Sequence, residues 1–328
     1  MSQNNYCTYF DINFAVYGLA LLESIFRHDP NARVYVLCLD EETFELLSKN
    51  ENKKRFLIDL KSIEKNFPSL SEAKRNRTIT EYFWTLTPCV IYFLIYVKKV
   101  CDKLTYLDAD QFFFSSPKPI FDEIKDAEIA IMPHRFPAEI DYLKEHGYYN
   151  VSWLTFRNSI ESKKCLSWWM KSCLEWCYAK VDGLRYGDQK YLDQFPIKFK
   201  GVKEIENDGC GLAPWNLSSF NFENEIILFH FQSFRISGPN IYSAVIQLLD
   251  KTNVAEFKNK VLSVYLSCLK KHVRKLPKNI KTPNSDKSLK QTENSFYIIV
   301  IFSKIFFIRN KILKTIFTRY INDYVSLS

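Results

Sequence analysis

The chain has 328 residues, 47% of them hydrophobic and 16% aromatic, which allows one large domain or two modest ones and excludes an intrinsically disordered protein. Its nine cysteines are scattered and form no CxxC pair, which argues against a zinc site and a disulfide framework and fits a reducing cytosol. The charge is uneven, because residues 251–328 carry a net +12 and residues 1–250 carry −4, for a total of +8. The acidic body therefore offers no positive groove for a nucleic acid.

The body of the sequence alternates between strand and helix patterns. Apolar runs typical of strands occupy 6–10, 33–40, 55–60, 103–108, 128–134, 151–158 and 225–234. Helical patterns occupy 14–27, 41–50, 79–99 and 162–180. This order predicts an α/β domain with a mixed, mostly parallel sheet flanked by helices. The nearly uncharged run 82–97 has 16 residues, fewer than the roughly 20 needed to span a bilayer, so we expect a buried helix there.

The two ends of the chain give further expectations. The opening residues MSQNNYCTYF lack the basic and apolar regions of a secretory signal, so none is expected. The predicted organisation is a domain over 1–245, a helical and polar linker over 246–295 and a basic amphipathic helical tail over 296–328. One face of that tail helix collects the apolar side chains Phe302, Ile305, Phe306, Leu313, Ile316, Phe317 and Tyr320. Such a helix is typical of segments that lie on an anionic membrane, and packing on the body is the alternative.

Two aspartates, Asp108 and Asp110, follow the apolar run KLTYL and precede the aromatic run Phe112–Phe114. Two carboxylates so close repel each other unless a cation lies between them. Carboxylate oxygens suit Mg²⁺ or Mn²⁺, with substrate phosphates completing the coordination, so this motif predicts a divalent metal bound with a phosphorylated ligand. A solvated turn is the alternative. His230, in ILFHFQSF, could be a third ligand or a buried core histidine.

Five segments in this order resemble a known group of enzymes: an N-terminal strand with Asp11 and Asn13, then YLDAD, YYNVSWLTFRN, YGDQKYLDQF and a late HF. Over about residues 6–240 the chain is similar to the metal-dependent GT-A glycosyltransferases, and most similar to the retaining family-8 type that includes bacterial lipopolysaccharide galactosyltransferases and glycogenin. The resemblance implies a Rossmann-like nucleotide-diphospho-sugar transferase fold, Mn²⁺ (or Mg²⁺) and a UDP-sugar donor. It implies transfer of a hexose, with retention, to a glycan or lipid-linked acceptor in surface polysaccharide or lipopolysaccharide synthesis.

The resemblance also implies roles for single residues on the nucleotide side. Asp11 and Asn13 would contact the uracil, with Tyr9 beside it, although either could merely cap the following helix. Asp108 and Asp110 would hold the metal together with His230, and Asp108 would also lie near the ribose.

On the sugar side, Asn150 would touch the donor sugar. Asp188 and Gln189 would lie beside the anomeric carbon, with a helix cap as the alternative role. The segment NDGCGLAPWN, 207–216, would form a loop on the acceptor side, where Trp215 could stack on a sugar or simply belong to the core. A lipid-linked acceptor would explain the basic tail, and would place a cytoplasmic enzyme at the inner face of the plasma membrane.

Two departures from the family put diphosphate binding in question. Trp84 stands where the family has an arginine in the helix before the two aspartates. After the late histidine, Ser233 and Arg235 replace the family's glycine and lysine, and Arg235 could take over the phosphate contact. A catalytically inactive GT-A relative that binds glycans or membranes is therefore the alternative. A sugar nucleotidyltransferase would need a glycine-rich loop near the first strand, and a haloacid-dehalogenase phosphatase would need its aspartates earlier in the fold.

Overall fold

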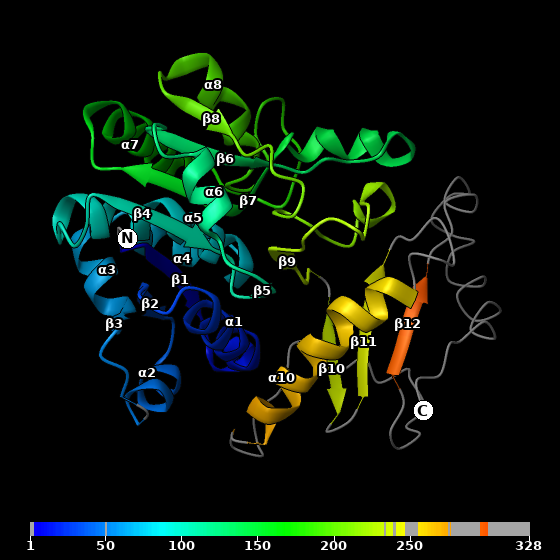
Figure 1. Cartoon of the computed structure of the whole chain (residues 1–328). Coiled ribbons are helices and arrows are strands. Elements are labelled where there is room, and N and C mark those ends of the chain that lie inside the picture. Colours follow the sequence, from blue (N-terminus) through cyan, green and yellow to red (C-terminus); the bar gives the residue numbers. More distant parts are fainter. Residues whose placement is uncertain are drawn as a thin grey trace.

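A seven-stranded mixed sheet forms the centre of the computed structural model, which describes residues 3–49, 51–232, 234–238, 241–246, 255–274, 276 and 296–300 (Figure 1). The strand order is β3-β2-β1-β4-β7-β6-β8. The strands are β1 (Asn5–Phe10), β2 (Arg33–Cys38), β3 (Arg55–Asp59), β4 (Lys103–Leu107), β6 (Ile129–Pro133), β7 (Tyr149–Arg157) and β8 (Val202–Glu204). Within this sheet β7 pairs antiparallel with β4 and β6, and the other neighbours pair in parallel. The predicted α/β fold with a mostly parallel sheet is therefore confirmed.

Helices cover both faces of the sheet. The helices are α1 (Ala15–His28), α2 (Glu41–Ser48), α3 (Leu60–Asn66), α4 (Leu70–Asn76), α5 (Ile79–Tyr92), α6 (Lys118–Glu123), α7 (Ile160–Glu175), α8 (Phe195–Lys198) and α10 (Ser263–Val273). Shorter turns of 3₁₀ or π helix are η1 (Ile12–Phe14), η2 (Phe93–Val97), η3 (Ala138–His146), η4 (Lys190–Gln194), η5 (Leu217–Ser219) and η6 (Lys258–Leu262). None of the helices in the described parts of the chain is long and apolar enough to cross a membrane.

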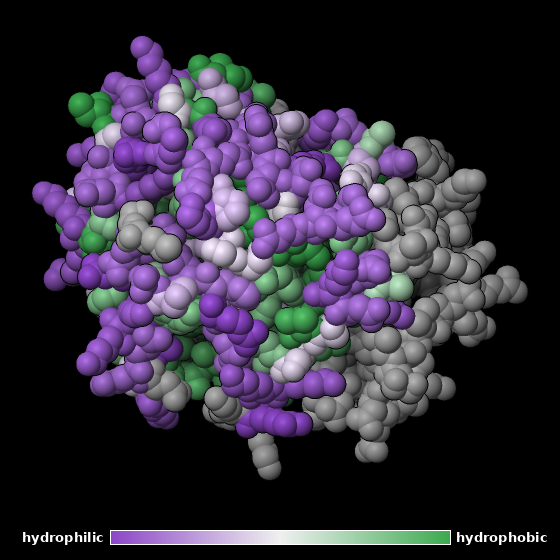
Figure 2. All heavy atoms as spheres, in the orientation of Figure 1, coloured by the Kyte–Doolittle hydropathy of each residue, from purple (hydrophilic) through white to green (hydrophobic). Residues whose placement is uncertain are grey.

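The two faces of the sheet carry separate cores because successive strand residues point to opposite sides. In β1, Cys7 packs with α5 and α7, whereas Tyr6 packs with α1. A third cluster joins the other side of α1 to α10, through Tyr17 and Tyr265. Hydrophilic residues cover most of the surface drawn in Figure 2, around a hydrophobic area near its centre. All nine cysteines are unpaired, as their spacing predicted.

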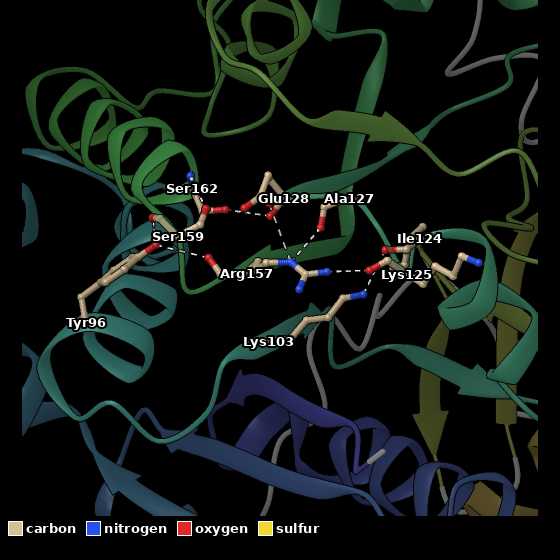
Figure 3. A network of polar contacts seen from close by, with 9 residues as sticks. All are labelled: Tyr96, Lys103, Ile124, Lys125, Ala127, Glu128, Arg157, Ser159 and Ser162. Atoms are coloured by element: carbon tan, nitrogen blue, oxygen red, sulfur yellow. Dashed lines mark hydrogen bonds and ion pairs between the residues drawn. The ribbon is translucent and has the colours of Figure 1, made fainter. Parts of the chain in front are cut away.

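A network of polar contacts fixes the connection that leads into β6 (Figure 3). Arg157, in β7, donates hydrogen bonds to the carbonyl oxygens of Lys125 at 2.5 Å and Ala127 at 3.4 Å. Lys103, in β4, donates to the carbonyl of Ile124 at 3.0 Å. These carbonyls follow the end of α6, where cations are favourable because the helix dipole is negative there. The network therefore holds the start of β6 against β4 and β7.

The predicted strand over 225–234 is much shorter than expected, and it lies outside the main sheet. Only β9 (Leu228–His230) forms, and it pairs antiparallel with β5 (Gln111–Phe113), with Gln111 opposite His230. On its other side, the backbone NH of Leu228 donates to the carbonyl of Gly209 at 3.0 Å. The other described residues of the predicted strand, 225–227, 231, 232 and 234, lie outside any strand.

The C-terminal region differs from the predicted helix where the structure describes it. The first five tail residues form strand β12 (Phe296–Val300), which pairs in parallel with β11 (Ile241–Ile246), and β11 pairs with β10 (Arg235–Gly238). The helix prediction is therefore wrong for these five residues, because pairing with β11 satisfies their backbone groups in extended form. Residues 301–328, which carry the predicted amphipathic face, lie outside the described residues.

We expect Gly209→Ala to destabilise the protein by about 2–3 kcal/mol, because its Cβ would lie 2.2 Å from the backbone carbonyl oxygen of Glu225. The backbone cannot give way there without moving β9. Gly183→Ala is the matched control, since no atom lies within 4 Å of its Cβ and only the left-handed backbone, φ +56°, costs about 1 kcal/mol. Urea unfolding measures both, and equal losses would contradict the steric argument.

Candidate functional site

The site lies at one edge of the main sheet, where β1, β4 and β6 all end. These strands run in the same direction, because β7 is antiparallel to both β4 and β6. Asp11, Asp108 and His134 directly follow their carboxyl ends, and Asn150 lies at the start of β7, at the same edge. Strands β2 and β4 lie on opposite sides of β1, so the chain order reverses between β1 and β4. Such a switch point is where open α/β sheets bind ligands.

A cavity of about 1010 Å³ opens at this edge. It is lined by every predicted site residue whose side chain the structure describes: Tyr9, Asp11, Asn13, Asp108, Asp110, Asn150, Asp188, Gln189 and His230. Trp84 and Trp215 also line it. The side chain of Arg235 lies outside the described residues. No lysine or arginine appears among the described residues that line the cavity.

Asp108, Asp110 and His230 form a compact group in this cavity. Their potential ligand atoms all lie within 4.8 Å of one another. His230 Nε2 is 3.0 Å from Asp110 Oδ1 and 3.7 Å from Asp108 Oδ2. Two carboxylates and one imidazole make a donor set that suits Mn²⁺ or Mg²⁺, so the residues present fit the ion that the sequence predicts.

Short-range structure explains why two aspartates so near in sequence reach the same point. The chain leaves β4 at Asp108 and turns, with the backbone NH of Gln111 donating to the carbonyl of Asp108 at 3.2 Å. Gln111 then starts β5, whose pairing with β9 brings in His230. The backbone NH of Phe231 also donates to the carbonyl of Asp110 at 2.8 Å. Phe112, directly after Gln111, is fully buried.

The ionisable groups of the site have shifted pKa values. Burial raises the pKa of Asp108 to about 6; His230 opposes this increase and the Asp110 carboxylate adds to it. For His230, burial works to lower the pKa, but the carboxylates of Asp110 and Asp108 outweigh it, so the net shift is upward. Burial, helped by Asp108, raises the pKa of Asp188 to about 7, and one of its carboxylate oxygens has no hydrogen-bond partner in the described structure. Groups with such shifts in a cleft are typical of functional sites.

The residues on the β1 side already make local contacts. Asp11 caps η1, accepting from the backbone NH of Phe14 at 2.9 Å, and Asn13 donates to Asp11 at 3.2 Å. The capping role considered for Asp11 therefore exists, and both side chains still face the cavity. The Tyr9 hydroxyl donates to the carbonyl of Phe83 at 3.0 Å and meets Thr87 Oγ1 at the same distance. Tyr9 therefore offers its ring, rather than its hydroxyl, to a ligand.

Asn150 and Gln189, which the resemblance assigns to the sugar, are held by the backbone around them. Asn150 Oδ1 accepts from the NH of Ser152 at 2.7 Å, and Gln189 Nε2 donates to the carbonyl of His146 at 3.1 Å. Gly187 adopts a left-handed backbone with φ +51°, and a Cβ there would lie 3.1 Å from the Trp84 ring. Trp84 therefore packs over the turn that precedes Asp188.

Sequence reasoning did not identify His134 and Phe136 as site residues. Both line the cavity, and Trp215 packs beside them. The Trp215 Nε1 donates to the carbonyl of His134 at 2.8 Å, so the indole is held in place by the segment that follows β6. The signal was available, because IMPHRF places a histidine at the end of a predicted strand, as KLTYLD does for Asp108.

Similar proteins are known for part of the chain. No family model matches the chain. It is 30% identical over 231 residues to the uncharacterized protein YfnD of Bacillus subtilis (strain 168), covering 66% of this chain and 74% of YfnD. The chain belongs to the YfnD family. It is also 28% identical over 253 residues to the uncharacterized protein YfnF of the same organism, covering 72% of this chain and 83% of YfnF.

Solved structures give weaker similarities. The galactosyltransferase LgtC, in complex with donor and acceptor sugar analogs, aligns with a TM-score of 0.49 at 17% identity, over 81% of this chain and 95% of LgtC. The glycosyltransferase GlyE of Streptococcus pneumoniae TIGR4 aligns with a TM-score of 0.49 at 14% identity, over 86% of this chain and 66% of GlyE. Similarity at this level does not transfer an activity to this chain.

A second group of metal-type side chains, Glu23, Cys268 and His272, lies where α10 meets α1. Glu23 already forms ion pairs with Arg27 at 2.8 Å and Lys271 at 2.6 Å, and it lies 3.1 Å from His272. Because two cations already neutralise this carboxylate, we assign the group to holding α10 on α1 rather than to binding a metal.

In the absence of divalent ions, we expect stability to fall as pH rises from about 4 to about 7, because Asp188 then keeps in the folded state a proton that the unfolded chain has lost. Asp188→Asn removes this titration, so its free energy of unfolding should lose about 1–3 kcal/mol less over that range than the wild type does. Urea unfolding with EDTA at pH 4, the lower end of that range, and at pH 8, about one unit above its upper end, measures this. The exposed Asp126→Asn should behave as wild type, and identical pH dependence in Asp188→Asn would contradict the prediction.

Proposed function

We propose that the protein is a metal-dependent glycosyltransferase of the GT-A, family-8 type, which moves a hexose from a UDP-sugar to a glycan or lipid-linked acceptor. The observation that carries the proposal is the Asp108–Asp110–His230 group at the switch point of the sheet, in one cavity with Asp188. A metal-type group beside a further buried carboxylate suits a reaction in which a diphosphate leaves a sugar carbon.

The proposed cofactor is Mn²⁺ (or Mg²⁺), held by Asp108, Asp110 and His230. When bound, this ion would neutralise the negative charge that develops on the departing diphosphate. The described lining of the cavity offers no lysine or arginine for that purpose, so phosphate binding should depend on the ion more than it would in a site with a basic side chain. Arg235 remains a prediction for the same diphosphate, from its place in the sequence.

The nucleotide base is proposed to lie at the β1 end of the cavity, where Asp11 and Asn13 supply polar atoms and Tyr9 supplies a ring. Tyr9 and Tyr106 lie with their ring centres 5.6 Å apart, so the wall there is aromatic. A flat base fits an aromatic wall with polar atoms at its edge. The donor sugar is then proposed to extend toward Asn150, at the start of β7, and toward Asp188 and Gln189 in the same cavity.

Retention of configuration can arise by two routes. In one, the Asp188 carboxylate attacks the anomeric carbon and breaks its bond to UDP, and the acceptor hydroxyl then displaces the carboxylate and loses its proton. In the other, the acceptor attacks from the face that UDP leaves, while Asp188 and Gln189 stabilise the positive sugar. Both routes require Asp188 beside the anomeric carbon. The unpaired oxygen of its buried carboxylate supports that placement.

We expect Asp188→Asn to lower turnover by at least about 100-fold while binding of UDP with Mn²⁺ stays within about threefold of wild type. NMR of the wild-type product should show the anomeric configuration of the donor. The variant Asp188→Gly leaves room for added azide at the position of the carboxylate. If azide restores turnover and a glycosyl azide is the product, the double-displacement route is indicated. An inverted product would contradict the proposed retention.

The decisive experiment is calorimetric titration of UDP with Mn²⁺ and with EDTA. We expect micromolar to millimolar binding to wild type only with Mn²⁺, and a loss of at least about tenfold in Asp110→Ala, because one charged ligand is gone. Asp126→Asn is the control carboxylate outside the cavity.

Three outcomes separate the alternatives. Metal-dependent binding followed by turnover with a panel of UDP-sugars supports the enzyme. Metal-dependent UDP binding with no turnover for any donor supports a catalytically inactive relative. The lack of lysine and arginine among the described residues that line the cavity favours this alternative. No UDP binding under either condition rejects the proposed donor.

Residues 296–328 are proposed to bring the enzyme to the inner face of the plasma membrane and to a lipid-linked acceptor. This proposal depends on the basic and apolar sequence of that segment. The role in surface polysaccharide or lipopolysaccharide synthesis depends on the family-8 resemblance.

A further inference from the structure

His134 occupies a rigid position in the cavity wall, directly after β6. Its backbone NH donates to the carbonyl of Tyr148 at 3.0 Å, and its own carbonyl accepts from Trp215 Nε1 at 2.8 Å and Asn216 Nδ2 at 3.0 Å. Its ring stacks on Phe136 with centres 4.5 Å apart and planes 12° apart. Only 5% of the residue is exposed. None of the functional roles assigned above uses this side chain.

The contacts of the His134 ring define its tautomer. Nδ1 lies 3.2 Å from the carbonyl oxygen of Tyr148, which can only accept a hydrogen bond, so Nδ1 must carry the proton. Burial lowers the pKa of His134 to about 4, so the ring is neutral near pH 7. A neutral ring protonated at Nδ1 has a lone pair at Nε2, which is therefore a fixed hydrogen-bond acceptor.

That acceptor belongs to the cavity. His134 is among the residues that line it, and the hydrogen bond that holds its ring, to the carbonyl of Tyr148, is made by Nδ1. The Nε2 atom is not one of the side-chain atoms that are both fully buried and without a partner. A ligand in the cavity can therefore reach it. An accessible nitrogen on a ring this firmly held is preorganised to meet a donor group on a ligand.

The surroundings of His134 indicate the kind of ligand. Phe136 and Trp215 place aromatic rings beside it, with ring centres 6.2 Å apart. Trp215 also packs edge-on against His230, at 5.7 Å and 85°, so this wall adjoins the proposed metal group. Aromatic surfaces next to a single polar acceptor suit a molecule with apolar CH faces and hydroxyl groups at its rim, which describes a hexose.

We propose that His134 Nε2 accepts a hydrogen bond from a hydroxyl group of a bound carbohydrate, which lies against Phe136 and Trp215. This inference depends on the glycosyltransferase function proposed above and names a specificity-determining residue of the same site. The carbohydrate is either the hexose of the donor or the acceptor sugar, and the two can be told apart by experiment.

The test compares His134→Phe, which keeps a flat ring on Phe136 but removes the acceptor, with His134→Gln, which keeps an acceptor oxygen. Calorimetry with Mn²⁺ uses UDP, UDP-glucose and UDP-galactose as probes, and then methyl glucoside and methyl galactoside on protein saturated with UDP. We expect His134→Phe to bind UDP within about twofold of wild type and to bind one sugar-bearing class about 3- to 10-fold more weakly. His134→Gln should bind the same sugar probes with at least half of the lost affinity restored, measured as log Kd.

The pattern of loss identifies the source of the hydroxyl. A loss confined to UDP-sugars assigns it to the donor hexose, and a loss confined to the methyl glycosides assigns it to the acceptor. Unchanged binding of every sugar probe by His134→Phe overturns the inference and leaves the proposed function intact. If His134→Phe loses the same affinity for UDP as for all sugar probes, the residue has only a structural role, and this result also overturns the inference. If wild type binds none of the UDP probes, the proposed function and this inference both fail.

A measurement on the wild-type protein tests the same inference if the His134 variants do not fold. The ¹⁵N chemical shift of wild-type His134 Nε2 should report an unprotonated nitrogen near pH 7. It should move when a UDP-sugar or a methyl glycoside binds, and not when UDP alone binds. A protonated Nε2, or a shift that no sugar probe moves, contradicts the proposal.

Discussion

Repulsion between carboxylates in one buried cavity is the constraint on which the site depends. Asp108 and Asp110 stand at the two ends of a short turn, and Asp11 and Asp188 line the same cavity. Removing such groups from water disfavours their charged forms, and each negative neighbour adds to that cost. The described lining holds no lysine or arginine to offset them, so His230 is the compensating group that the fold supplies beside the pair. A divalent cation would remove the conflict.

The rest of the fold brings these carboxylates together at one edge of the sheet. Strands β1, β4 and β6 end together, and β7 begins there, so each contributes polar side chains at one edge while its apolar residues stay in the two cores. The histidine comes from a different part of the chain, on a strand of three residues that pairs with β5 and forms an isolated bridge to Leu212 on its other side. The contacts of Gly209 and Leu212 on the other side of β9 keep that short strand in place. Local stability and site geometry therefore share the same few hydrogen bonds.

Periodicity in the sequence predicted every strand of the main sheet except β8, and the helices α1, α2, α5 and α7, because each of these elements buries a regular apolar pattern. The shorter helices α3, α4, α6 and α8 were not predicted, because a helix of one or two turns shows too little periodicity. The stretch 225–234 was misleading, since Phe229, Phe231 and Phe234 are buried in the cluster that joins α1 to α10 rather than by continuous strand pairing. The strand β12 could not be predicted, because the same apolar residues suit a strand or a helix until a partner strand is known. The aspartates were predictable because like charges beside an apolar run are unusual. His134 was missed because its role depends on Trp215 and Tyr148, which come from distant positions.

The antiparallel pairing of β5 with β9 has a topological consequence. Residues 110 and 230 are separated by about 120 positions, and the segment between them includes β6, β7 and β8. A ligand held by both positions would be released when the chain unfolds, so it would stabilise the folded protein by its binding free energy, about 2.7 kcal/mol at a concentration 100 times its Kd. The same two residues would then set both how tightly a bound cation is held and how much that cation stabilises the fold.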